Sequence, residues 1–180
     1  TNRLVGSEMC IRDRDITGLI GQYAHGNEPS HHTTYMYAYS GQPYKIADKV
    51  RYINNELYTD QPDGLSGNED CGQMSAWYIL SSMGFYPVNP SNGAYVFGSP
   101  LFDEVVLDIP GQKQFKISAK NNSDKNIYIQ SVSLNGEDHK YSYITHKEIL
   151  KGGELEFTMG PKPNKDFGKE KKYRPESIVY

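Results

Sequence analysis

The chain has 180 residues, of which 37% are hydrophobic, enough to form a packed core in one ordinary domain or two small ones. Its 19 basic and 22 acidic residues give a formal net charge of −3, without the basic footprint that nucleic-acid binding requires. No apolar run approaches the roughly 18 residues of a membrane-spanning helix. Fifteen tyrosines against a single tryptophan indicate many half-buried aromatic side chains that form hydrogen bonds.

The first 14 residues differ from the rest of the chain. Residues 1–14 follow no periodic pattern and are similar to a translated sequencing adapter, so we treat them as a non-native leader. An ordinary loop or a fraying helix is the alternative for this segment. The chain begins without methionine and shows no signal peptide, and we expect it to be a piece of a longer protein whose N-terminal part is missing.

Residues 15–89 have a helical pattern. A first helix is expected to begin near Pro29, with Asn27 as its cap, and to end at Gly41. A second begins near Pro43, and a third covers residues 74–83 before Gly84, a residue type that favours the left-handed conformation at a helix end. The second helix carries an apolar stripe formed by Ile46, Val50, Ile53 and Leu57.

After Pro90 the hydrophobic period changes to two, which predicts strands. Asn135 and Gly136 follow one strand pattern and form a strong hairpin signal. We therefore expect an antiparallel β-sandwich over residues 90–160, followed by a solvated tail, rich in lysine, proline and glycine, over residues 161–180. The expected strands cover residues 95–97, 105–109, 115–119, 127–134 and 155–159.

The stretch Gly64–Tyr78 runs from a glycine-rich loop through two adjacent carboxylates, Glu69 and Asp70, into the third helix. A helix N-terminus favours negative charge, so Asp70 can be a plain cap that contributes about 1 kcal/mol. Two carboxylates on such a loop also suit a sugar hydrolase or a calcium site. Cys71 has no partner outside the leader, which leaves a disulfide framework unsupported and makes packing its expected role.

A second motif, Gln22–His32, contains three histidines beside an amide and a carboxylate. A zinc site is not the first choice, because no Cys or His pair has zinc-finger spacing and the adjacent His31 and His32 point apart. Lone histidines are usually hydrogen-bonded structural residues, although one of these could bind a sugar hydroxyl.

Together with Gly41–Lys45 and Gly67–Trp77, this motif closely resembles glycoside hydrolase family 92, whose members are calcium-dependent, inverting exo-α-mannosidases, mostly bacterial. The resemblance covers about residues 18–160. It implies an α plus β fold in sequence-separated halves, in which the final helices of an (α/α)6 toroid precede the β-sandwich. It also implies a periplasmic or secreted enzyme that removes terminal α-linked mannose from N-glycans or mannans.

The resemblance further implies roles at the loop that precedes the third helix. Asp70 occupies the position of the general base, with Glu69 beside it. Asn68 lies where many members carry a second acidic residue, so this chain departs from the family pattern there. The general acid belongs to upstream sequence, and we expect this chain alone to be inactive.

The remaining expected roles concern calcium and the sugar. Glu28, Asn27 and Asp70 are the expected calcium ligands, since calcium prefers carboxylate and amide oxygens. His25, Asn27, Glu28, His31 and Gln73 are the expected substrate-binding residues. Two alternatives stay open: a non-catalytic carbohydrate-binding or structural module, and another (α/α)6 sugar hydrolase or phosphorylase.

Overall fold

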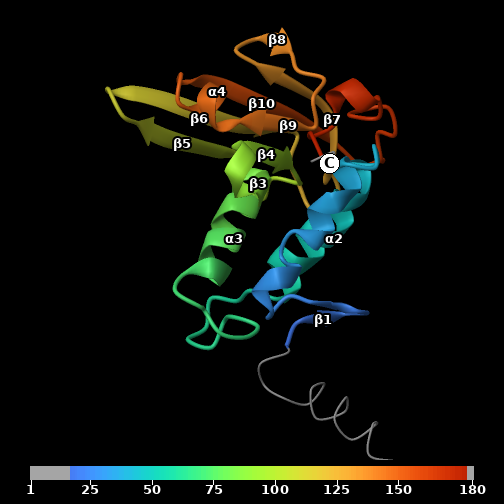
Figure 1. The fold of residues 1–180 in the computed structure, drawn as a ribbon, viewed down its shortest axis with the longest axis vertical. Helices are drawn as coiled ribbons and strands as arrows, with labels where there is room; N and C mark the ends of the chain where they lie inside the picture. The colour runs from blue at the N-terminus through green and yellow to red at the C-terminus, as the bar shows by residue number, and fades with distance from the viewer. Residues whose placement is uncertain (1–16, 178–180) are drawn as a thin grey trace, which may run out of the picture.

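The computed structural model describes residues 17–177, so the expected leader, residues 1–14, lies outside the described residues. Figure 1 shows two α-helices, α2 (Tyr44–Glu56) and α3 (Gln73–Met83), extending side by side from a layered β-structure. The loop between them lies at the end of the pair that is farther from the sheets. The α plus β class is confirmed.

The apolar stripe of α2 faces the helical core. Ile46, Val50 and Ile53 are fully buried and share a cluster with Trp77 of α3. Burial of such side chains stabilises the fold by about 1.5–3 kcal/mol each. This stripe therefore fixes how the two helices pack, as the helical spacing predicts.

The first expected helix is wrong in type. Two short 3-10 helices, η1 (Glu28–Ser30) and η2 (Thr33–Ala38), occupy that region, and the Asn27 side chain makes no capping hydrogen bond. The buried residues Tyr35 and Ala38 are three apart, which matches the three-residue turn of a 3-10 helix. A short hairpin precedes them, formed by β1 (Leu19–Ile20) and β2 (Tyr23–Ala24).

The change from helix to strand occurs earlier than expected. Gly84 ends α3 in the left-handed conformation with φ 102°, and β3 (Phe85–Asn89) begins at the next residue. The helical pattern therefore ends at Gly84 rather than at residue 89. Pro87 does not prevent strand pairing, because the register between β3 and β4 (Ala94–Phe97) shifts between Tyr86 and Asn89.

Two larger sheets form the rest of the molecule. The three-stranded sheet has the order β3-β4-β9, and the five-stranded sheet has the order β5-β6-β10-β7-β8. Their facing sides share one core, to which Phe85, Phe97, Phe115 and Phe157 contribute. The strands not yet given are β5 (Glu104–Ile109), β6 (Lys113–Lys120), β7 (Tyr128–Leu134), β8 (Glu137–Asp138), β9 (Tyr143–Thr145) and β10 (Gly153–Gly160). Three short helices complete the fold: η3 (Pro90–Asn92), α4 (His146–Ile149) and η4 (Lys171–Tyr173).

The expectation of purely antiparallel sheets is wrong at one pair. Strand β10 pairs antiparallel with β7 but parallel with β6. The connection from β6 to β10 contains β7, β8, β9 and α4, which is long enough for a parallel crossover. The expected hairpin does form between β7 and β8, where Asn135 (φ 53°) and Gly136 (φ 83°) both adopt positive φ.

Residues 161–177 are mostly exposed to solvent, but several of them are anchored on the rest of the molecule. Phe167 packs against the core of the sheets. The Asn164 side chain donates to Gln130 O at 2.8 Å, and Tyr173 O accepts from Ser142 N at 2.9 Å. These contacts tie the segment to β7 and to the residue that precedes β9.

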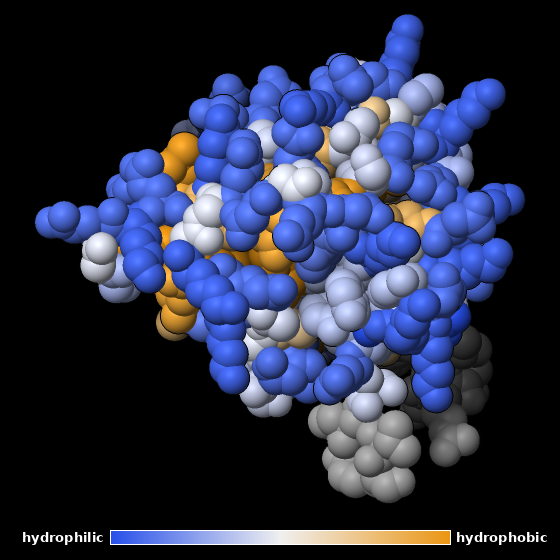
Figure 2. Space-filling view, turned by 90° about the horizontal axis from the view of Figure 1, so that it is seen from above, coloured by the Kyte–Doolittle hydropathy of each residue, from blue (hydrophilic) through white to orange (hydrophobic). Residues whose placement is uncertain are grey.

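The outer face of the five-stranded sheet carries charge. Lys116 pairs with Glu104 at 2.8 Å, and Lys120 pairs with Glu156 at 2.7 Å across neighbouring strands. Figure 2 views the molecule from the side of the sheets and shows mainly hydrophilic side chains there. None of the described helices has both the length and the apolar character needed to cross a membrane.

Candidate functional site

The two motif loops meet through glycines. A side chain at Gly67 would place its Cβ 2.8 Å from Gly26 Cα, and one at Gly26 would collide with Ser66 O. Real Cβ atoms do not approach backbone so closely, so both positions require glycine. This contact brings together segments about 40 residues apart in sequence, Ala24–Ser30 and Leu65–Gly72.

The contact places the carboxyl groups of Glu28 and Asp70 within hydrogen-bond distance of each other. That hydrogen bond raises the pKa of Asp70 above its ordinary value, and desolvation and the like charge of Glu28 add to the shift. Asp70 is exposed, and it begins a run of three residues with positive φ: Asp70 at 46°, Cys71 at 59° and Gly72 at 95°. The two carboxylates therefore form an accessible pair on an unusual backbone turn.

Glu69 has a different role from Asp70. Its Oε1 accepts a hydrogen bond from Ser75 N at 3.1 Å, and the N-cap residue of α3 is Gly72. The alternative in which Asp70 is the helix cap is therefore wrong, because the capping carboxylate is Glu69. These neighbouring side chains have different partners, the Ser75 amide for Glu69 and Glu28 for Asp70.

His25 is fully buried, and both of its ring nitrogens have partners. The Tyr58 hydroxyl donates to Met74 O at 3.0 Å, so it accepts from Nε2 of His25 at 2.7 Å. Nδ1 of His25 then accepts from the Tyr23 hydroxyl, also at 2.7 Å. Burial lowers the pKa of His25 to about 3, and the ring is neutral at ordinary pH.

His31 is held in the same way. Its Nε2 donates to His25 O at 2.9 Å, and its Nδ1 accepts from the Gln73 amide at 3.2 Å. The same Gln73 nitrogen also donates to the Tyr86 hydroxyl. The side chain of His31 is 1% exposed, and burial lowers its pKa.

Trp77 joins this network from α3. Its Nε1 donates to His31 O at 3.1 Å, and its ring packs edge-on against His25 with the centroids 4.5 Å apart. Trp77 is fully buried and packs in the core of the helices. The buried side chains of His25 and His31 thus connect the Ala24–Ser30 loop to the core of the helices.

Sequence reasoning did not select Tyr23, Tyr58 and Tyr86, whose hydroxyls complete the network. The high tyrosine content was the available signal, but it does not say which tyrosines take part. Their choice depends on which rings reach the two histidines after folding.

The fit of this site to a calcium ion is incomplete within the described part of the chain. Glu28 and Asp70 supply two carboxylates, and the exposed Asn27 lies next to Glu28. Among residues 17–177 no group of three or more His, Cys, Asp or Glu is arranged to hold a metal ion. Calcium takes six to eight oxygen ligands, so these residues can provide only part of its coordination.

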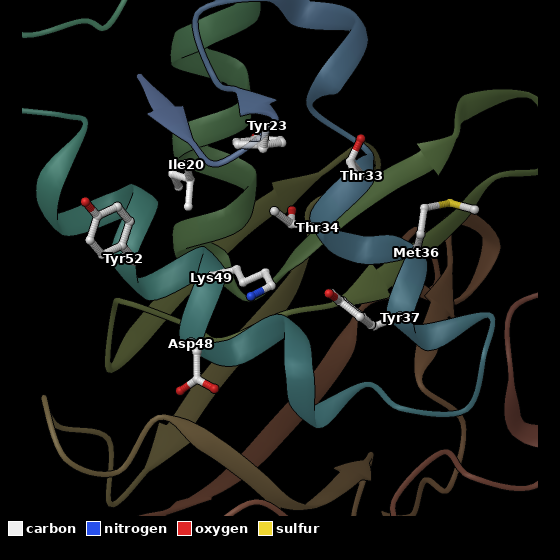
Figure 3. A pocket seen from close by; sticks show the side chains of 9 residues that line it. All are labelled: Ile20, Tyr23, Thr33, Thr34, Met36, Tyr37, Asp48, Lys49 and Tyr52. Atoms are coloured by element: carbon white, nitrogen blue, oxygen red, sulfur yellow. The ribbon is translucent and has the colours of Figure 1, made fainter. Parts of the chain in front are cut away.

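A separate hollow of about 540 Å³ lies between the β1–β2 hairpin, η2 and α2. Figure 3 shows Ile20 and Tyr23 entering it from the hairpin, and Tyr52 from α2. Neither Glu28 nor Asp70 lines it. The hollow and the carboxylate pair are therefore different places on the molecule.

Comparison with known proteins gives consistent results. Residues 4–161 match the glycosyl hydrolase family 92 catalytic domain, a match that includes part of the expected leader. The GH92 α-mannosidase BT3965 of Bacteroides thetaiotaomicron, solved with mannoimidazole, is 42% identical, with a TM-score of 0.89 over 93% of this chain and 22% of that chain. The inverting GH92 mannosidase BT2199 of the same organism is 41% identical, with a TM-score of 0.82 over 97% of this chain and 22% of that chain.

An uncharacterized secreted glycosidase of Arthroderma benhamiae is 33% identical over 138 residues, which are 75% of this chain and 18% of that protein. The chain thus spans about a fifth of the length of these relatives. Because the family match covers most of the 180 residues, the chain belongs to glycosyl hydrolase family 92, a family of glycoside hydrolases that includes α-mannosidases.

Proposed function

We propose that this chain supplies part of the active site of an inverting exo-α-mannosidase that hydrolyses terminal α-linked mannose of N-glycans or mannans. The observation that carries the proposal is the pairing of Glu28 with Asp70 across two loops that meet through Gly26 and Gly67. A pair of like charges held close together opposes folding, so its presence favours a functional role. The activities named for BT3965 and BT2199 support the same reaction.

Asp70 is the proposed general base. A base that activates water must be reachable by solvent, and Asp70 is exposed. Its raised pKa moves the carboxylate toward the pH at which proton transfer is efficient. Glu69 is engaged by the Ser75 amide, and Asn68 carries no charge, so the base function falls to Asp70 within this loop.

The general acid has to come from another part of the enzyme. In an inverting glycosidase the acid and the base lie about 6.5–9.5 Å apart, so that water fits between the base and the sugar. Glu28 and Asp70 are in hydrogen-bond contact, which is too close for one to be the general acid and the other the general base. We therefore expect no turnover by this chain alone.

Calcium is the proposed cofactor, with Glu28, Asn27 and Asp70 as its ligands from this chain. When bound, the ion would hold two neighbouring sugar hydroxyls. A cation at this point would also offset the repulsion between the two carboxylates. The remaining oxygen ligands would come from water, the sugar and parts of the enzyme outside this chain.

His25, His31 and Gln73, expected to bind substrate, are proposed to act from beneath the loops. Both histidines are at most 1% exposed, and each of their ring nitrogens has a protein partner. They hold Asn27 and Glu28 in place, and those two residues are the proposed contacts with the sugar. This assignment replaces direct sugar contact by the histidines.

The larger architecture is also a proposal. We infer that α2 and α3 belong to an (α/α)6 toroid and that the two packed sheets are its β-sandwich partner. Large apolar side chains exposed on the helices support this, because further helices would cover them: Met36 is 44%, Tyr52 50% and Ile79 53% exposed. A periplasmic or secreted location is supported by the name of the Arthroderma benhamiae relative.

A chimera tests the proposed function. Residues 18–160 would replace the corresponding segment of BT3965, and hydrolysis of a mannose disaccharide would be measured with calcium and with EDTA. We expect calcium-dependent turnover that Asp70→Asn lowers about 100- to 10,000-fold, as loss of a general base does. Asp63→Asn, an exposed carboxylate earlier in the same loop, serves as the control.

Three outcomes would contradict the proposal. Near-normal activity of the Asp70→Asn chimera would remove the base assignment. An unchanged response to EDTA and an unchanged KM in Glu28→Gln would give Glu28 a structural role. Sugar binding without turnover by the unaltered chimera would favour the carbohydrate-binding module.

A further inference from the structure

Tyr58 touches both motif loops and the start of α3. It directly follows Leu57, the C-cap of α2, and its hydroxyl lies 2.7 Å from His25 Nε2 and 3.0 Å from Met74 O. His25 lies three residues before Glu28, and Met74 is in the first turn of α3. One hydroxyl therefore connects the Glu28 segment to the helix that follows Asp70.

The backbone and ring of Tyr58 add two further links. The backbone pairs with Leu65 in an isolated antiparallel bridge, five residues before Asp70. The ring lies parallel to Trp77, at 2° with centroids 6.1 Å apart, and 4.7 Å from the ring of Tyr78. The ring has packing contacts that do not involve the hydroxyl, so the contribution of the hydroxyl can be tested separately.

We propose that Tyr58 is a positioning residue that sets how closely Glu28 and Asp70 approach each other. It touches neither carboxyl group and acts through His25 on one side and through Leu65 and Met74 on the other. Burial raises the pKa of the Tyr58 phenol, so the hydroxyl stays neutral and works as both donor and acceptor. The catalytic consequence rests on the proposed function, but the structural claim does not.

The geometry explains why no other group replaces this hydroxyl. Without it, the Nε2–H of His25 and the carbonyl of Met74 lose a shared partner inside the protein, where unpaired polar groups are costly. The Tyr23 hydroxyl bonds the opposite ring nitrogen of His25 and reaches no group of α3 among the described contacts. The connection between the two loops would then depend on the Gly26–Gly67 contact.

Hydrogen exchange tests the structural claim in this 180-residue chain. Tyr58→Phe removes the hydroxyl and keeps the ring, and Tyr35→Phe is the matched control. Tyr35 is also fully buried in the helical core, and its hydroxyl donates a hydrogen bond, 2.7 Å to Ser81 Oγ, but among the described contacts this hydroxyl bonds neither Ala24–Ser30 nor Leu65–Gly72. The measured quantities are the exchange rates of the Gly26 and Asn27 amides, which donate to Thr17 O and Ala24 O, relative to amides of α2.

We expect Tyr58→Phe to speed exchange of the Gly26 and Asn27 amides about tenfold relative to α2, and Tyr35→Phe to leave that ratio unchanged. An equal effect of the two variants on the ratio would overturn the positioning role, since both would then act through global stability. No effect of Tyr58→Phe would overturn it as well.

Turnover by the BT3965 chimera tests the catalytic consequence. Tyr58→Phe is expected to lower kcat by about 10- to 100-fold with little change in KM, because small misplacements of reacting groups cost that much. Tyr35→Phe is expected to keep kcat at a temperature where both variants are folded. Normal kcat in Tyr58→Phe would overturn the catalytic consequence, whereas an inactive unaltered chimera would overturn the proposed function and leave the exchange result to decide the role of Tyr58.

Discussion

Single residues at the candidate site divide into fully buried neutral groups and carboxyl groups that lie nearer the surface, Glu28 half-buried and Asp70 exposed. His25 and His31 are held neutral by burial and by hydrogen bonds to protein partners, whereas Glu28 and Asp70 face each other as carboxyl groups. The first pair satisfies every polar atom of its rings, which stabilises the fold. The second pair opposes folding at neutral pH, because two like charges are held together.

Removal of one charge from the carboxylate pair should stabilise the chain. In the folded protein the pKa of Asp70 lies above its ordinary value, so the folded state pays a penalty when Asp70 is ionised. Asp70→Asn should raise the thermal midpoint at pH 7 in EDTA, and the gain should fade as the pH falls toward 4. Asp63→Asn should change little, and a lower midpoint for Asp70→Asn would contradict this account.

Burial of His25 should make the chain sensitive to acid. Its pKa is about 3 in the folded protein and 6.5 in the unfolded chain, so between these values the unfolded state binds the additional proton. The contribution of neutral His25 to the free energy of unfolding is therefore fully present above pH 6.5. Below that pH it falls by about 1.4 kcal/mol per pH unit. Urea unfolding between pH 5 and 7 measures this slope, and His25→Asn should be less stable at pH 7 but show a flatter slope.

At the scale of elements, the site depends on loops and short helices rather than on the middle of a long helix. The η1 turn carries Glu28, and a left-handed turn before α3 carries Asp70. Neither element is long enough to be stable alone, so their positions follow from contact with each other and with α3. At the Gly26–Gly67 contact the two backbones are too close together to admit a side chain.

A methyl group at this contact should separate the loops. Gly26→Ala would force its Cβ against Ser66 O and is expected to cost about 3 kcal/mol, the upper part of the range for overpacking. Gly21→Ala is the control: its φ of +61° is unfavourable for alanine, which the φ of Gly26 is not, but its Cβ would meet no atom within 4 Å, and about 1 kcal/mol is expected. Chemical denaturation measures both, and equal losses would show that the loops can move apart freely.

At the scale of the whole molecule, a buried arginine joins the helical core to the sheets. Arg51 of α2 is 6% exposed and donates to Ser99 Oγ at 3.0 Å, to Pro100 O and to Asn122 Oδ1. The last three residues lie in connections that lead into or follow the strands. The two cores also approach each other at β3 and β4, which contribute residues to both. The helical core and the sheets are therefore joined by direct side-chain contacts.

Loss of this arginine should weaken the connection between the two cores. Arg51→Met keeps much of the volume but leaves buried oxygen acceptors without a donor, and we expect about 2–4 kcal/mol of lost stability. Lys49→Met, at an exposed position on the same helix, should change stability by less than about 0.5 kcal/mol. Separate melting transitions for helix and strand signals in Arg51→Met would show that Arg51 couples the cores.

The sequence by itself determined the family, the α2 and α3 helices, the Gly84 helix end and the Asn135–Gly136 hairpin. These features depend on the hydrophobic period of each segment, on glycine in turns and on the order of the motifs. All three can be read from residues that are close together in the sequence. It also selected Glu28 and Asp70, which the fold brings into contact.

Only the tertiary structure decided the other features, because they depend on residues far apart in the chain. The parallel pairing of β6 with β10 depends on where a long connection returns, and η2 forms because Tyr35 and Ala38 pack into one core. Glu69 is the helix cap because its neighbour Asp70 turns toward Glu28. The partners of His25 are a tyrosine two residues away and another 33 residues away, a combination that no local pattern contains.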